Sequence, residues 1–350
     1  FDILKKILFL GAAHFQLPPI QYAIKAGYNV ITADNLKHNP GHRLANKSYI
    51  ISTTDKNKIL KIAEKENVDG VLAFGSDLSM LTSSYVTTKL GLPGNDLDTV
   101  EKLVFKSKFR RSLNKNGLQN FPYKIFHVNQ KLELIDYVDS LRSEQIIKPV
   151  DGNGSKGVSI LSSSSNIEKK INDAFNNSVT KNVILEKFIH KKPPQICGDG
   201  FFYKGSLKFI YFGDGYFYDN KNYLAPWGET FPSIHNDNIL KKAKNKIELI
   251  LTRLGFKTGP FNFDIFVTKH DDIIVNEIGP RSGGNFIPTI IKKQTGVDMI
   301  KGAVENCVDD NFSLSADFKK PKDYFGSYMI HVKNNYGRFE SIDISSYFLK

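Results

Sequence analysis

The sequence has few of the features that mark secreted or membrane proteins. Only two cysteines occur among 350 residues, Cys197 and Cys307, and their wide separation indicates neither a disulfide framework nor a zinc site. No uninterrupted apolar run approaches the roughly 20 residues that a membrane helix needs. The run KKILFLGAA near the start imitates a signal peptide, but a strand-then-helix pattern follows it directly, so we interpret it as a first strand. These absences favour a cytoplasmic protein without a membrane partner.

A dinucleotide-binding fingerprint is also absent. The first hundred residues alternate strand-like and helix-like segments, which predicts a parallel, Rossmann-like sheet with strands at 6–12, 28–34, 48–52 and 69–75. The turn after the first strand, GAAHFQ, has Gly11 but lacks the further glycines that a pyrophosphate requires, so NAD is not expected. Ligands of such sheets bind beyond the carboxyl ends of the strands, where His14 and Asp77 are substrate candidates. Both residues also fit ordinary turn or capping roles.

The net charge of +12 does not come from one basic block. The lysines are spread along predicted helices and between asparagines, so we expect no nucleic-acid partner. A positive field of this kind also suits an anionic nucleotide or substrate.

The segment from Phe261 to Asn285 carries the chemistry most clearly. Its alternating runs FNFDIFV and DDIIVNEI predict a β-hairpin that brings Asp264 and Glu277 to one end of paired strands. Two carboxylates on rigid strands suit Mg²⁺, which takes one or two carboxylates and completes its shell with water and phosphate oxygens. Arg281 follows in a turn that aims a guanidinium at phosphate. The alternative is a surface hairpin whose acidic residues are solvated.

Two further segments fit nucleotide binding. The loop 151–157, DGNGSKG, lies between apolar runs, and its glycines let backbone NH groups approach phosphate, although the loop is not a Walker A motif. Lys148 precedes it within an apolar strand, where a phosphate would offset the cost of burying its charge; the alternative is a lysine snorkelling from an edge strand. In the strand 182–189, Glu186 is suited to accept from the amino group of adenine.

Together these segments resemble the ATP-grasp superfamily of carboxylate-amine ligases. The resemblance rests on Lys106, Lys148 with GNGSKGV, LEKFI, FNFDIF and NEIGPRSGG in this order, between about residues 5 and 307. It implies an α/β and α+β architecture in which an N-terminal Rossmann-like pre-ATP-grasp lobe precedes two α+β lobes that clamp ATP. The domains expected on this basis are 1–104 for the first lobe, 105–190 for the small lobe, 191–310 for the large lobe and 311–350 for an incomplete closing subdomain.

The resemblance also implies roles for individual residues. Asp264 and Glu277 would ligate Mg²⁺ or Mn²⁺, and Arg281 and Lys148 would act in catalysis. The residues expected to bind ATP are Lys106, Lys148, Gly152, Gly154, Ser155, Gly157, Glu186, Gln195 and the segment of Lys187, Phe188 and Ile189. Weaker substrate candidates are His14, Asp77, Gly283, Gly284 and Asn285.

Three departures from the family pattern affect these assignments. Gly279 stands where many members have a metal-ligating Asn, for which Asn276 or Asn285 are possible substitutes. Phe105 replaces the Asp that usually precedes the first lysine. The carboxylate that usually contacts ribose is replaced, with Gln195 the nearest candidate and Asp199 the second.

The implied activity is an ADP-forming ligase that joins a small-molecule carboxylate to an amine through an acyl phosphate. Two alternatives stay open: a bicarbonate- or purine-type ATP-grasp enzyme, and a catalytically silent ATP-binding protein. A homodimer is a further expectation. The aromatic insert 213–235, with the only tryptophan, either walls the acceptor pocket or forms a plain hairpin. The helix pair within 289–307 is expected to be scaffold behind the metal-binding strands.

Overall fold

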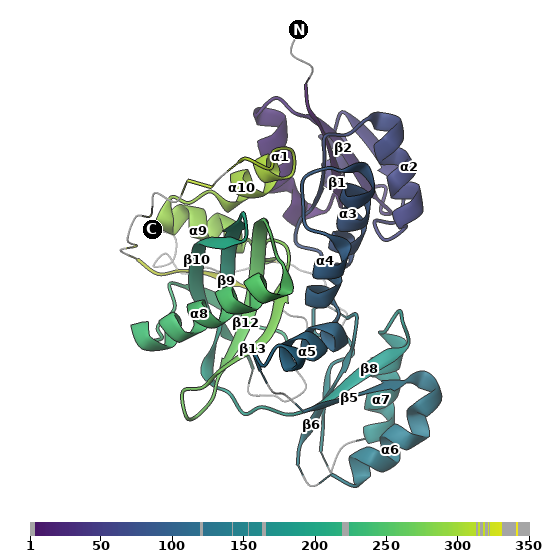
Figure 1. Cartoon of the computed structure of the whole chain (residues 1–350), viewed down its shortest axis with the longest axis vertical. Helices are drawn as coiled ribbons and strands as arrows, with labels where there is room; N and C mark the ends of the chain where they lie inside the picture. The colour runs from purple at the N-terminus through teal and green to yellow at the C-terminus, as the bar shows by residue number, and fades with distance from the viewer. Residues whose placement is uncertain are drawn as a thin grey trace.

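Three sheets organise the part of the chain that the computed structural model describes. That part comprises residues 4–119, 122–141, 143–152, 154–162, 166–218, 224–312, 314–315, 318, 321, 323–330 and 341. In Figure 1 the N-terminal lobe lies at the top, the large lobe in the middle and the small lobe at the lower right.

The N-terminal lobe is the predicted parallel sheet. Its strands lie in the order β3-β2-β1-β4 and all pair in parallel. The strands are β1 (Lys6–Leu10), β2 (Asn29–Asp34), β3 (Lys47–Ile50) and β4 (Gly70–Ala73). The helices are α1 (Leu17–Lys25), α2 (Lys56–Glu66) and α3 (Asp77–Leu90). Alternating β and α segments form this sheet because parallel strands need a crossover connection between them.

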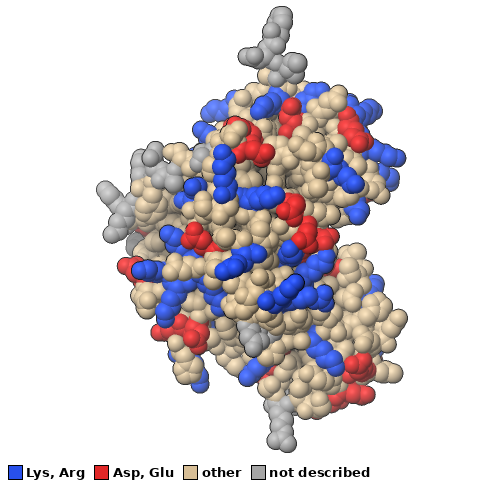
Figure 2. All heavy atoms as spheres, in the orientation of Figure 1, with Lys and Arg blue, Asp and Glu red and all other residues tan. Residues whose placement is uncertain are grey.

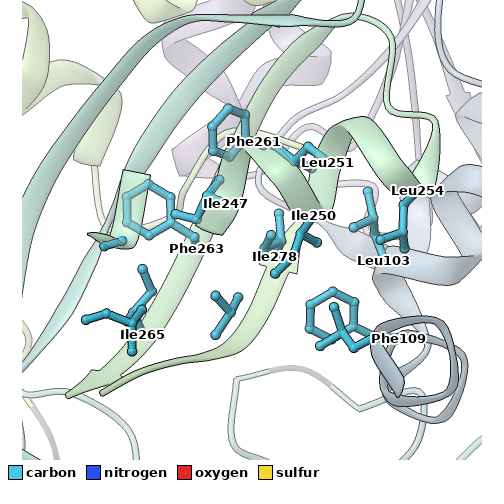
Figure 3. Close-up of a cluster of buried hydrophobic side chains, with 14 of the residues drawn as sticks. Leu103, Phe109, Ile247, Ile250, Leu251, Leu254, Phe261, Phe263, Ile265 and Ile278 are labelled. Carbon is cyan, nitrogen blue, oxygen red and sulfur yellow. The ribbon is translucent and has the colours of Figure 1, made fainter. Parts of the chain in front are cut away.

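Two short helices connect this lobe to the rest. The sequence predicts one helix over 97–117, but the structure has α4 (Leu97–Val104) and α5 (Lys106–Lys115), broken at Phe105, whose ψ of 113° is extended. Leu103, Phe109 and Leu113 pack into the core of the large lobe, and Figure 3 shows Leu103 and Phe109 directed at that core. The helix α5 therefore packs on the large lobe, whereas the predicted boundary at residue 105 assigned it to the small lobe.

The small lobe is an antiparallel sheet in the order β5-β8-β6-β7 with two helices packed against it. Its strands are β5 (Tyr123–His127), β6 (Gln145–Pro149), β7 (Ser159–Leu161) and β8 (Asn182–Lys187), and its helices are α6 (Lys131–Asp139) and α7 (Ile167–Asn176). Since β6 has a partner on both sides, Lys148 does not extend from an edge strand, and that alternative is wrong.

The large lobe is an antiparallel sheet in the order β13-β12-β9-β10-β11-β14. Its strands are β9 (Lys192–Tyr203), β10 (Ser206–Tyr216), β11 (Gly228–Phe231), β12 (Gly259–Val267), β13 (Ile273–Gly279) and β14 (Phe325–Tyr328). The long helix α8 (Asp237–Leu254) covers one face, where Ile247, Ile250 and Leu251 meet Phe261 and Phe263 (Figure 3). The other side of β12 and β9 faces the small lobe and carries the polar side chains described below.

The helix pair α9 (Ile287–Thr295) and α10 (Met299–Asn306) joins the large lobe to the first, as scaffold (Figure 1). Ala303 and Val304 of α10 share a core with Ile7 and Phe9 of β1. The strand β14, expected in a separate subdomain, extends the large sheet by pairing with β11; residues 331–340 and 342–350 lie outside the described part.

Charge is distributed over the surface as the sequence predicts. Figure 2 shows lysines and arginines spread across the face drawn, with acidic residues between them. Among the described residues, none of the helices combines the length and apolar composition needed to span a bilayer.

Candidate active site

A cavity of about 700 Å³ lies between the small lobe and the large sheet. Its walls come from β6, β8 and the glycine loop on one side and from β9, β12 and β13 on the other. The predicted site residues that line it are Asp77, Lys106, Lys148, Gly152, Gly154, Ser155, Glu186, Lys187, Phe188, Ile189, Gln195, Asp264, Glu277, Arg281, Gly284 and Asn285. Predicted site residues as distant in sequence as Asp77 and Asn285 therefore meet in one cavity.

The predicted hairpin is confirmed, and it pairs the two carboxylates directly. Asp264 on β12 and Glu277 on β13 are register partners, next to an irregularity in the pairing. Burial raises the pKa of Asp264, and the negative charge of Glu277 raises it further. The Glu277 side chain is 44% exposed, so it opens toward the cavity. Burial would also raise the pKa of Glu277, but the charges of Lys106 and Lys148 outweigh that effect and lower it.

A buried ion cluster lies next to this pair. Glu186 accepts from Arg110 Nε at 2.6 Å with one oxygen and from Lys148 Nζ at 2.8 Å with the other. Lys148 and Arg110 also reach the side chain of Asn276 on β13, at 3.2 and 3.4 Å. Both oxygens of Glu186 are thus engaged by cations, and its contact with adenine stays a prediction.

The cluster carries more positive than negative charge. Although burial alone would raise the pKa of Glu186, Arg110 and Lys148 lower it to about 2, so this carboxylate is ionised. Burial lowers the pKa of Lys148 most; Glu186 opposes this effect, and the charges of Arg110 and Lys106 add to it. Two buried cations beside one anion favour a further anion in the adjoining cavity, and a phosphate oxygen satisfies this need.

The glycine loop closes over one end of the cavity. Lys106 donates to the carbonyl of Gly152 at 2.7 Å, and Ser155 Oγ donates to the Leu224 carbonyl of the large lobe at 3.0 Å. Gly154 and Gly157 have φ values of +58° and +68°, which glycine adopts without a steric cost. The loop therefore spans from the small lobe to the insert of the large lobe.

Arg281 is held by a residue of the first lobe. Its Nε and one terminal nitrogen donate to the two carboxylate oxygens of Asp77 at 2.9 and 2.8 Å. Burial would lower the pKa of Arg281, but Asp77 outweighs this and raises it. Asp77, at the start of α3, thus orients the arginine at the edge of the cavity, a role beyond the capping function that was its alternative.

Several predicted positions lie elsewhere. His14 is exposed and outside the cavity lining, and Gly157 packs beneath the loop, where an added Cβ would meet Asn177 at 2.7 Å. The backbone NH of Gly283 donates to Asp199 at 2.9 Å. Asp199 is fully buried and does not line the cavity, so it is not placed to contact ribose. These residues therefore do not face the cavity.

The two asparagines considered as metal ligands have other partners. Asn276 Oδ1 accepts from Lys148, and Asn285 Nδ2 donates to Glu229 Oε1 at 3.2 Å. Among the described residues, no group of three or more His, Cys, Asp and Glu side chains is arranged for a metal. Asp264 and Glu277 are therefore a pair of carboxylates with no third side chain of these types arranged beside them for a metal in the described part of the chain.

Sequence reasoning missed three residues of the cavity. Arg110 lies one helical turn after Lys106 on α5, and this i, i+4 spacing was the signal that could have identified it. Lys191 lies 3.5 Å from the ring centre of Phe217, and burial lowers its pKa to about 8 despite the opposing charge of Asp264. Glu229 comes from the insert, where no motif marked it. Phe217, Leu224 and other residues of that insert line the cavity, which favours the pocket-wall interpretation over a plain hairpin.

Comparisons with known proteins support the same architecture. No family model matches the chain. A formate-dependent phosphoribosylglycinamide formyltransferase of Aliivibrio fischeri is 25% identical over 303 residues, which cover 83% of this chain and 72% of that protein. An L-amino acid ligase structure from Bacillus licheniformis superposes with a TM-score of 0.77 at 18% identity, covering 95% of this chain and 82% of that one.

A third similar protein was solved with nucleotide bound. It is the biotin carboxylase domain dimer of a 2-oxoglutarate carboxylase from Hydrogenobacter thermophilus, in complex with MgADP, ADP and bicarbonate. It matches with a TM-score of 0.76 at 14% identity and covers 93% of this chain and 74% of that one. Both structures superpose on more than nine-tenths of this chain, so the predicted fold class is confirmed. The comparisons therefore support the ATP-grasp fold that the sequence predicts.

Proposed function

We propose that this protein is an ATP-dependent ligase that joins a small-molecule carboxylate to an amine through an acyl phosphate and releases ADP and phosphate. The observation that carries the proposal is the meeting of two paired carboxylates, Asp264 and Glu277, with the cations Lys106, Lys148 and Arg281 in one cavity between two sheets. The relationship to ligases of the same fold supports it.

The carboxylate pair fits a magnesium ion. Burial and the negative charge of Glu277 raise the pKa of Asp264, and a bound divalent cation would stabilise both carboxylates in their ionised form. A site with only two protein ligands suits Mg²⁺, which keeps several waters and takes phosphate oxygens. Asp264 and Glu277 would hold the ion; when bound, it supplies positive charge that neutralises the phosphate oxygens. Gln195, which donates to Asp264 at 2.7 Å, orients that ligand.

The cations of the cavity bind and orient the phosphate chain of ATP. Lys106 from α5 and Lys148 from β6 approach from the small lobe, and Arg281 approaches from the turn after β13. In the first step an oxygen of the substrate carboxylate bonds to the γ-phosphorus while the bond to ADP breaks. Positioning and charge neutralisation supply most of the acceleration in such transfers. The contact of Ser155 with Leu224 covers the cavity, which protects the acyl phosphate from water.

In the second step the amine attacks the carbonyl carbon of the acyl phosphate. The C–N bond forms, the C–O bond to phosphate breaks, and phosphate leaves with the electron pair. In this scheme Arg281 stabilises the negative charge that develops on the phosphate. This scheme requires no covalent bond between the protein and the substrate. The cavity-lining Cys197 is not suited to form one, because burial raises its pKa well above the usual value and keeps it a thiol.

A second candidate uses bicarbonate as the carboxylate. The likeness to a biotin carboxylase domain solved with bicarbonate and MgADP supports this candidate. An ATPase rate that rises with bicarbonate and does not require an organic carboxylate would support this candidate over the first.

Nucleotide product analysis tests the proposal. The protein is incubated with Mg-ATP and pooled amino acids, sugar acids and amines, and ADP, AMP and phosphate are quantified. We expect ADP and phosphate that require a carboxylate, with the rate lowered at least about 10²-fold by Glu277→Gln, because a metal ligand is lost. Glu168→Gln, on the exposed surface of α7, is the matched control and should keep the wild-type rate.

Other products would contradict the proposal. AMP and pyrophosphate would exclude the acyl phosphate route. Tight ATP binding with no product on any pool would support a catalytically silent nucleotide-binding protein.

A further inference from the structure

Glu229 is a buried carboxyl group of the cavity that the mechanism above does not use. It lies on β11, lines the cavity, and only 6% of its surface is exposed. Its Oε1 accepts from Asn285 Nδ2 at 3.2 Å, whereas its Oε2 is buried and has no hydrogen-bond partner among the described residues. No lysine or arginine of the described chain forms an ion pair with it. A buried carboxyl oxygen without a donor is costly, so its retention in a cavity points to a ligand that supplies the donor.

The surroundings leave space for that ligand. Gly215 on β10 is the register partner of both Glu229 on β11 and Gln195 on β9, so no side chain stands between them on this part of the sheet. A Cβ added at Gly215 would meet its nearest neighbour, the Phe217 ring, only at 3.5 Å. The floor of the cavity is therefore open from Gln195, which contacts Asp264, across to Glu229.

The loop opposite Glu229 has an unusual backbone. Asn285 and Phe286 both have positive φ, 51° and 60°, although neither is glycine. A bulky aromatic residue in this conformation is strained, and such strain is typical of functional loops. The conformation places the Asn285 carboxamide against Glu229 and fixes one carboxyl oxygen while the other stays available.

We propose that Glu229 and Asn285 form the subsite for the nucleophilic amino group, and that Glu229 removes a proton from it. This inference rests on the proposed ligase function and names its second substrate as a primary amine that arrives as an ammonium ion. An ammonium donates to the unpartnered Oε2, and its positive charge compensates the buried carboxylate.

The proton balance follows from the bonds. One N–H bond breaks, its electron pair stays on nitrogen, and the proton bonds to Glu229 Oε2. The neutral amine then forms the C–N bond to the acyl carbon as the C–O bond to phosphate breaks. The remaining extra proton on nitrogen leaves with the phosphate, and Glu229 returns its own proton to water when the products depart.

The charge environment of Glu229 agrees with this role. Burial raises its pKa to about 8, with the charges of Asp264 and Asp199 adding to the effect and the Asn285 hydrogen bond opposing it. Cys197 on β9 also interacts with Glu229, and burial keeps it a neutral thiol. A base with a pKa near the working pH combines a useful fraction of the ionised form with enough strength to accept a proton.

The test compares two nucleophiles on one acyl phosphate. The protein is supplied with Mg-ATP and the twenty protein amino acids, with or without hydroxylamine, which is largely neutral at pH 7 and needs no base. Amides between amino acids and amino acid hydroxamates are quantified for wild type, Glu229→Gln and Glu229→Asp. The control is Glu305→Gln, the same change at a carboxylate that bridges Tyr22 and Tyr28 away from the cavity.

We expect Glu229→Gln to lower the ratio of amide to hydroxamate about 10²-fold or more, the size of a general-base effect. Glu229→Asp should restore part of the ratio, and the acidic limb of the pH profile of amide formation should disappear in Glu229→Gln. Glu305→Gln should keep the wild-type ratio.

Each other outcome overturns the inference and identifies what failed. An unchanged ratio in Glu229→Gln, or an equal loss of amide and hydroxamate, would show that Glu229 is no base for the amine while leaving the ligase function intact. Absence of hydroxamate and amide with wild type would refute carboxylate activation on these amino acids, and the inference for this substrate class with it. Melting temperatures of the variants separate either result from unfolding.

Discussion

At the scale of single residues, the most informative feature is the buried set of Arg110, Glu186 and Lys148. Two cations share one carboxylate that is only 2% exposed. An arrangement of this kind contributes little net stability compared with an apolar core, but removing its anion leaves two buried cations uncompensated. Its retention beside the glycine loop fits a site that needs positive charge held in place.

We expect Glu186→Gln to lower the free energy of unfolding by about 3 kcal/mol near neutral pH, because breaking a buried ion pair costs this much. The pKa of Glu186 in the folded protein, about 2, lies below its ordinary value of 4.5. Its contribution is therefore present above about pH 4.5 and is lost as the pH falls toward 2. Urea unfolding at several pH values should show a smaller acid-induced loss in the variant than in wild type.

The control for this prediction is Glu168→Gln, whose ion pair with Lys131 is largely exposed. Exposed pairs contribute little, so no clear change in the urea midpoint is expected. Equal effects of the two substitutions would contradict a special role for the buried cluster.

Asp77 provides a second test at the residue scale. Its two carboxylate oxygens hold one edge of the Arg281 guanidinium, so Asp77→Asn should disturb the orientation of the arginine. We expect kcat to fall roughly 10-fold or more, because small displacements of a positioning group are costly. Steady-state kinetics with the substrate found by product analysis checks this. Asp55→Asn, at the start of α2, is a matched helix-start control and should leave kcat unchanged.

At the scale of elements, patterns with a local cause were predicted well. The β12–β13 hairpin follows from alternating apolar residues, and the strand containing Lys148 follows from its apolar run. The break between α4 and α5 was missed because Phe105 has no helix-breaking chemistry; its extended backbone follows from tertiary packing of the helices on either side. The Glu229 position was missed for a related reason, since only the sheet order brings the insert beside the hairpin.

The glycine loop gives a prediction at this scale. Gly157→Ala would place a Cβ 2.7 Å from Asn177 and 3.1 Å from the Asp173 carbonyl, in a left-handed backbone. At Gly154 the backbone is also left-handed, but no atom lies within 4 Å of the added Cβ. We expect Gly154→Ala to cost about 1 kcal/mol from backbone strain alone and Gly157→Ala clearly more. Urea unfolding measures both, and equal losses would contradict the packing of the loop against α7.

At the scale of the whole molecule, the order of lobes was predictable because each lobe has its own pattern of segments. The contacts between the lobes were not predictable, because they join residues that are distant in sequence. Asn95 bonds to the backbone of Thr258 and Lys257, and Gly70 of the first sheet lies against the Cys307 carbonyl after α10. The small lobe, in contrast, has a separate core around Phe126. The first and large lobes therefore form one unit, to which the small lobe is attached.

This organisation predicts two separable patterns of hydrogen exchange. Gly70→Ala would put a Cβ 2.3 Å from the Cys307 carbonyl, so the first and large lobes must separate slightly and their amides should exchange faster. Leu134→Ala, at a fully buried position of the small-lobe core, should cost about 2–5 kcal/mol and speed exchange within β5 to β8. Mass spectrometry of exchanged peptides distinguishes the two patterns. Faster exchange across all three lobes in both variants would mean that the clamp opens as a single cooperative unit, and the small lobe would then have no independent freedom to close on ATP.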